Sequence, residues 1–164
     1  MSTNQRGGVD IYVLLVFLLV VFAAVTVILI AVNAAASEKH EVQAALNGAL
    51  QAAAQAALVK PAGGQESFNP ATAQQAFYAA FPADLGAGLA AQTQVVNLIT
   101  YNSPGVTPPG FPAGDVTPGP ALYAEVRLTV AMPPLFVGHP TATVPIYGVV
   151  AAAGFDQPPQ LWGG

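Results

Sequence analysis

The chain has 164 residues, of which 54% are hydrophobic and 7% are charged, and its mean hydropathy is +0.54. A soluble domain usually carries about 25% charged residues, so this composition is unlike that of an ordinary cytosolic protein. Only four Lys and Arg stand against eight Asp and Glu, which excludes the basic surface of a nucleic-acid binder, and the lack of cysteine excludes disulfides and thiolate sites.

The strongest feature of the sequence is an uncharged apolar stretch over residues 11–32. As a helix it would be about 33 Å long, enough to cross a hydrocarbon core of about 30 Å. Tyr12 lies at one end, where interfacial aromatic residues occur, and Thr26 can bond to a carbonyl group of its own helix. The stretch therefore predicts a transmembrane helix that follows a short polar leader over residues 1–10.

Cleavage near this stretch gives two alternatives to a retained anchor. A secretory signal would be cut after Ala36, and a prepilin-type peptidase would cut between Gly8 and Val9. The retained anchor is favoured, because the apolar stretch is longer than the roughly 7–15 residues of a signal peptide. We expect a single-pass plasma-membrane protein with its C-terminal domain outside, or a surface filament.

A helical extension is predicted over residues 33–60, because Ala, Leu, Gln and Glu favour helices and no proline occurs before Pro61. The membrane helix would then continue as one rod to about residue 59. Gly48, in the interior of this rod, predicts either a close approach of another helix or a local bend.

The extension has two distinct faces at helical spacing. One face is apolar, and the other carries amide side chains every four residues: Val42, Leu46, Ala49, Leu50, Ala53 and Ala57, against Gln43, Asn47, Gln51 and Gln55. Amides in place of charges suit close packing against a neighbouring protein. The alternative is that this helix covers its own domain.

Residues 61–164 are predicted to form a small domain that begins with a helix. A loop over residues 61–64 ends the rod, and Asn69 followed by Pro70 starts a short helix that closes at Pro82 or Gly86. One side of this helix is apolar and carries Ala73, Phe77, Ala80 and Phe81.

Strands are predicted over residues 90–101, 122–132 and 141–152, with an irregular Pro/Gly-rich loop over residues 102–120. Pro145 places the last strand at a sheet edge or a bulge. The fold class is therefore α+β, with a long N-terminal helix, transmembrane in its first part, and a small antiparallel-sheet head.

The second of these strands alternates in character, which predicts that only one of its faces is buried. Its exposed side is expected to carry Tyr123, Glu125, Arg127 and Thr129. Glu125 and Arg127 lie two residues apart on that face and suggest a surface ion pair worth at most about 1 kcal/mol.

No pattern in the sequence points to catalysis or to a cofactor. His40 lies among charged residues on a helix and His139 lies in a Gly-His-Pro turn, so neither belongs to a ligand cluster. The serines lack the context of a nucleophile, and no phosphate-binding or zinc motif occurs. We expect no catalytic, cofactor-binding or metal-binding residues, no enzyme activity and no small-molecule substrate.

The layout resembles pilin-like proteins, and among these it is most similar to the TadE/TadG-like minor pilins of tight-adherence pili. The parts that carry the resemblance are RGGVDIYVLLVFLLVVFAAVTVILIAV, the Ala-rich EVQAALNGALQAAAQAAL, and the late strand pair AEVRLTVAMPPLF and ATVPIYGVVAAA. The resemblance implies assembly by a secretion system, surface adhesion and packing of subunits through their N-terminal helices.

In this interpretation the apolar helix first anchors the protein in lipid. In a filament it then packs against the helices of other pilin-like subunits, where small residues permit close approach. The residues expected to pack between helices are Val16, Ala23, Ala24, Ala31, Leu46, Leu50 and Ala53. The partners are membrane lipid and other subunits, without nucleic acid. The alternative is a single-pass, membrane-anchored binding module of an envelope complex, with the loop over residues 102–120 as its partner surface.

Overall fold

The computed structural model describes residues 5–62, 64–132, 141–152 and 160–161. The chain divides into two units, one of residues 1–37 with 131–142 and one of Glu38–Val130 with Thr143–Gly164. We call the second unit the head. The head begins at Glu38, whereas the sequence placed its start after residue 60. It therefore includes the last part of the first helix.

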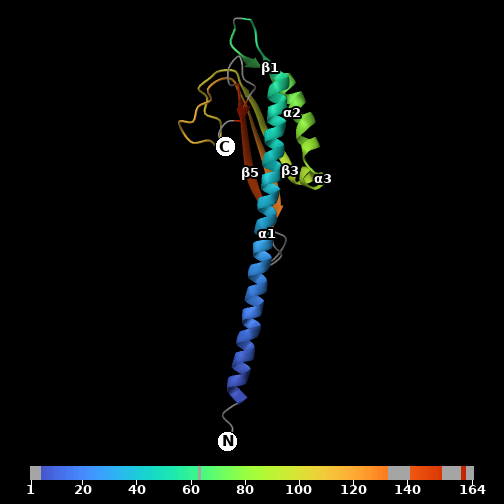
Figure 1. The fold of residues 1–164 in the computed structure, drawn as a ribbon, viewed down its shortest axis with the longest axis vertical. Coiled ribbons are helices and arrows are strands. Elements are labelled where there is room, and N and C mark those ends of the chain that lie inside the picture. Colours follow the sequence, from blue (N-terminus) through green and yellow to red (C-terminus); the bar gives the residue numbers. More distant parts are fainter. Residues whose placement is uncertain (1–4, 63, 133–140, 153–159, 162–164) are drawn as a thin grey trace. The chain divides into compact units, whose positions relative to one another are not determined.

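The first helix, α1, runs without interruption over Gln5–Ala57 (Figure 1). The predicted continuation beyond the apolar stretch is thus confirmed, but the helix begins at Gln5 instead of after the leader. Gly7 and Gly8 lie inside it despite their low helix propensity. Extending an existing helix adds about one hydrogen bond per residue, whereas starting a new one is costly.

A small hairpin follows α1, where the sequence predicted the end of the rod and a loop. It consists of β1 (Leu58–Val59) and β2 (Ser67–Phe68), which pair antiparallel. Strands this short leave no recognisable alternation in a sequence. An ion pair of 3.2 Å between Lys60 Nζ and Glu66 Oε1 lies across the hairpin.

The second helix, α2 (Pro70–Asp84), begins as the sequence predicts. Asn69 Oδ1 accepts hydrogen bonds from the backbone amides of Ala71 and Thr72, at 3.0 and 3.2 Å. Pro82 lies inside the last turn, so the helix ends between the two predicted positions. A further helix, α3 (Ala87–Gln92), includes the start of the predicted strand over residues 90–101.

Replacing Asn69 by Ala should destabilise the head by about 1 kcal/mol, because two amides of the first turn lose their acceptor. Asn69→Asp keeps the acceptor and should restore most of the loss. Denaturant unfolding of the three proteins measures the effect. Equal stability of Asn69→Ala and the unchanged chain would show that water satisfies these amides equally well.

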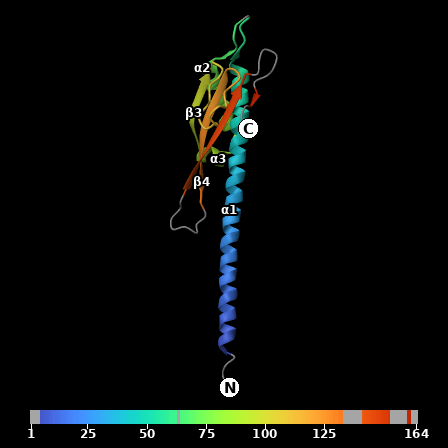
Figure 2. The same cartoon turned by 90° about the vertical axis from the view of Figure 1, so that its left-hand side faces the viewer.

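The sheet consists of β3 (Thr93–Tyr101), β4 (Ala121–Ala131), β5 (Thr141–Ala151) and the short β6 (Gln160–Leu161), in that order (Figure 2). The long N-terminal helix and the small antiparallel sheet confirm the predicted α+β class. Residues 133–140, which include His139, and residues 153–159 and 162–164 lie outside the described residues.

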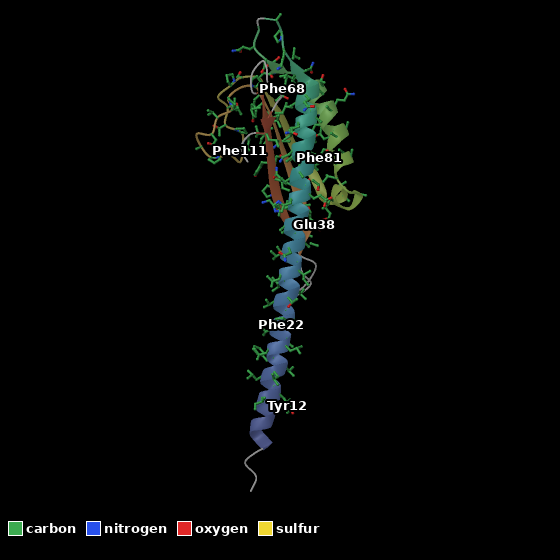
Figure 3. The ribbon with its side chains drawn as sticks, viewed as in Figure 1. Tyr12, Phe22, Glu38, Phe68, Phe81 and Phe111 are labelled. Carbon is green, nitrogen blue, oxygen red and sulfur yellow. The ribbon has the colours of Figure 1, made fainter. Side chains whose placement is uncertain are left out.

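One face of the sheet and two helices enclose the main core of the head. Its buried side chains come from α1, α2, β4 and β5: Val42, Leu46, Leu50, Phe77, Phe81, Leu122, Val126, Leu128, Ile146 and Val150. Figure 3 labels Phe68 and Phe81 in this unit. The helix approaches the sheet closely at Gly148, where an added Cβ would lie 2.6 Å from Leu50 Cδ1.

Gly48 marks a close approach, which is one of the two predictions made for it. An added Cβ at this position would lie 3.2 Å from Asp84 Oδ2 at the end of α2. That distance leaves little room for a side chain, so the glycine lets α2 end against α1.

Candidate functional site

The first candidate site is the apolar part of α1. Over residues 11–32 the large hydrophobic side chains are 40–74% exposed, Tyr12 and Phe22 among them (Figure 3). The helix is long and apolar enough here to cross a membrane. The predicted membrane helix is therefore present as a candidate span.

The single hydroxyl in the middle of this stretch is satisfied within the helix. Thr26 Oγ1 donates to the carbonyl oxygen of Phe22 at 2.8 Å, as the sequence predicts. A hydroxyl bonded in this way exposes no free donor to hydrocarbon. The candidate span therefore tolerates its one threonine at little cost.

The residues predicted to pack between helices fall into two groups. Val16 and Ala23 are exposed on α1, and Ala24 and Ala31 are partly exposed. The remaining three, Leu46, Leu50 and Ala53, are fully buried in the core of the head. This second group packs against the sheet and α2 of the same chain. Here the helical extension covers its own domain, which was the alternative to packing against a neighbouring protein.

The amide stripe on α1 is also used inside the head. Gln43 Nε2 donates to the carbonyl oxygen of Tyr147 on β5 at 3.0 Å and to Asn47 Oδ1 at 3.2 Å. Further along the stripe, Gln51 is half-buried and Gln55 is exposed. The first amides therefore hold the helix against β5, a role that sequence spacing alone did not reveal.

The Pro/Gly-rich loop over residues 102–120 covers part of the second face of the sheet. Its ends are joined by hydrogen bonds from Gly105 N to Thr117 O at 2.8 Å and from Thr117 N to Val106 O at 2.9 Å. Phe111 packs on a second apolar cluster, which comprises Ala121, Tyr123, Val149 and Ala151 with Ile99, Tyr101 and Tyr147 around them. The loop thus closes a small second core.

This second core corrects the prediction that Tyr123 is exposed. The side chain is fully buried, while Arg127 and Thr129 further along β4 are exposed as expected. The predicted surface pair is confirmed, with Arg127 Nη2 lying 3.6 Å from Glu125 Oε1. Alternation alone misses such a case, because it cannot show that a distant loop covers one end of a strand.

Burial leaves the Tyr123 hydroxyl without a hydrogen-bond partner among the described residues. Desolvation raises the pKa of this phenol far above its ordinary value, and the nearby Glu125 carboxylate raises it further. In the unfolded chain the phenol ionises near pH 10. Above about pH 10 the folded state therefore holds more protons than the unfolded one, and stability falls as pH rises.

Replacing Tyr123 by Phe should stabilise the head by about 1 kcal/mol at neutral pH, because it removes an unpaired buried hydroxyl. It should also flatten the decline of stability above pH 10. The exposed Tyr78→Phe is the control and should leave neutral-pH stability unchanged. Denaturant unfolding from pH 7 to 11 measures both effects, and a destabilised Tyr123→Phe at pH 7 would contradict this assignment.

An open cavity of about 290 Å³ lies where α1, the loop and β5 meet in the head. Its walls include Lys39 and Gln43 from α1, Phe111 from the loop, and Pro145 and Tyr147 from β5. One cation and one amide beside two aromatic rings make an amphipathic surface.

Within residues 11–62, 64–132 and 141–152, no three His, Asp or Glu side chains gather closely enough to hold a metal ion. His40 is exposed on α1. Comparisons with protein families, with characterised proteins and with solved structures gave no match.

Proposed function

We propose that this protein is a pilin-like structural subunit of a surface filament, or of the system that assembles one, and that it packs through its N-terminal helix. The observation that carries the proposal is the exposure of every large hydrophobic side chain over residues 11–32. A surface of this kind needs lipid or other apolar helices around it. The same helix then serves as an anchor before assembly and as a packing element afterwards.

The burial of Leu46, Leu50 and Ala53 restricts where neighbouring subunits make contact. These residues are already covered, so lateral helix packing falls to the part of α1 before the head. There Ala24 and Ala31 are seven residues apart and share one face. Small residues on a shared face let two helices approach closely in an apolar environment.

The test of this function is incorporation into sheared surface material when the protein is expressed with its native neighbours. We expect to find it there by microscopy and mass spectrometry. Finding it only as dispersed monomers in the membrane would count against a filament subunit.

Bulky substitutions separate packing from anchoring in the same experiment. Ala24→Leu with Ala31→Leu keeps the helix apolar but blocks close approach, so anchoring should persist while incorporation falls. Leu15→Phe, half a turn away from Ala24 around the helix, is the control and should incorporate normally. Normal incorporation of the double variant would exclude this face as a packing surface.

The cavity lined by Lys39 and Phe111 supports a second candidate, a membrane-anchored binding module of an envelope complex. Replacing residues 113–116, which are exposed, by Gly and Ser leaves Phe111 on its core. If the loop is the partner surface, this change should abolish capture of an envelope partner and leave membrane integration intact. Unchanged capture would exclude residues 113–116 as the partner surface.

A further inference from the structure

The two long strands toward the margins of the sheet, β3 and β5, differ in how their outward edges are protected. On β5, Pro145 has no amide to donate, Gln43 binds the carbonyl oxygen of Tyr147, and β6 pairs with Val150 and Ala151. Proline, side-chain caps and short covering strands are the usual means of preventing addition of another strand. The β5 edge is therefore largely closed.

The β3 edge has no proline, no side-chain cap and no covering strand among the described residues, and its one irregularity is a register shift between Val95 and Asn97. Thr93–Tyr101 pairs on one side with β4, and within the described residues no other hydrogen bond involves the backbone of residues 94–101. The strand contains no charge and no proline, and each of its side chains is at least partly exposed. β3 lies at the margin of the sheet (Figure 2), so a row of amides and carbonyls faces outward.

An apolar cavity of about 120 Å³ lies beside the start of this edge. It is formed by α2, the residues around α3 and β3, and its lining comprises Tyr78, Phe81, Pro82, Leu85, Ala90, Thr93 and Val95. Because Thr93 and Val95 belong to the edge strand itself, a strand added to β3 would pass the cavity. One aliphatic side chain of that strand would fill it.

We propose that the β3 edge is a docking site for an extended, uncharged segment of a partner polypeptide, which adds to the sheet as a further strand. The outward amides and carbonyls recognise a peptide backbone, and the neutral strand selects a neutral partner. The cavity adds a preference for one aliphatic side chain. A second copy of this chain offers only an identical β3 in return, because its β5 edge is closed.

This site lies in the head and does not depend on packing through α1. The inference therefore goes beyond the proposed function, and either can fail while the other holds. The filament test measures incorporation of the chain, whereas the test below measures protection of backbone amides in β3.

The experiment uses the full chain in detergent micelles and a capped nonapeptide that alternates Thr with Val or Leu. At saturation we expect exchange of the amides in residues 94–101 that are not paired with β4 to slow about tenfold or more, with β4 and β5 unchanged. The same peptide with alternate amides N-methylated is the control and should protect nothing. Unchanged exchange in β3 with the first peptide would overturn the proposal.

Two matched variants locate the site on the edge. Val96→Lys places a charge on β3 and should weaken peptide binding about tenfold. Thr129→Lys places the same charge on an exposed position of β4 and should leave binding unchanged. Equal weakening by both variants, or protection of β3 that grows with protein concentration in the absence of peptide, would also overturn it.

Discussion

Replacing Leu18 and Val21 by Arg should abolish stable membrane integration of the full chain. Both positions lie near the middle of the apolar stretch, where each arginine costs about 2.5–3.5 kcal/mol by insertion scales. Two such charges offset much of the gain from burying the surrounding aliphatic side chains. The change is measured by alkaline extraction of membranes, in which the unchanged chain should stay in the pellet and the variant should not.

The matched control for this prediction is Ala52→Arg, on an exposed position of α1 within the head. It adds a charge to the same helix outside the apolar stretch, so integration should be unaffected. If the double-arginine protein remains integral, the apolar stretch is not what holds the chain. If the natural product is soluble and begins at Ser37, the stretch is a cleaved signal instead.

Leu50→Ala should destabilise the head by about 2–5 kcal/mol, because it removes a fully buried side chain and leaves a cavity above the sheet. Gly148→Ala should cost about 1–3 kcal/mol, since its new Cβ would lie 2.6 Å from Leu50 Cδ1. Leu50→Ala removes the atom that the new Cβ at residue 148 would meet. The double variant should therefore be destabilised by less than the sum of the two single changes, by about 1 kcal/mol or more.

Denaturant unfolding of the two single variants and the double variant in micelles gives this coupling energy directly. Gly88→Ala is the control, because an added Cβ there meets no atom within 4 Å. It should be neutral or slightly stabilising in the helix α3. Strict additivity of Leu50→Ala and Gly148→Ala would show that the helix shifts away from β5 instead of being held against it.

Much of the local structure followed from the sequence, because its causes are local. The apolar stretch over residues 11–32 predicts a helix by length and composition, and Asn69 before Pro70 predicts the start of α2. Alternation predicted β4 nearly to the residue. In each case neighbours in the chain supply the hydrogen bonds or the periodicity.

One error was local: the start of the predicted strand over residues 90–101 belongs to α3, where Ala and Leu favour a helix. Others arose where a distant segment decides burial or pairing. Tyr123 is covered by a loop that has no periodicity of its own. The hairpin of β1 and β2 depends on pairing across a turn rather than on any run of strand formers. Such pairings require knowledge of which segments meet in space.

The candidate sites divide in the same way. The sequence alone determined the candidate membrane span, since a long uncharged apolar helix has few other stable environments. Only the tertiary structure decided that Leu46 and Leu50 lie inside the head, that Gln43 closes the β5 edge, and that β3 remains open. The physical reason is that periodicity shows which residues share a face, whereas the identity of what covers that face depends on segments far away in the chain.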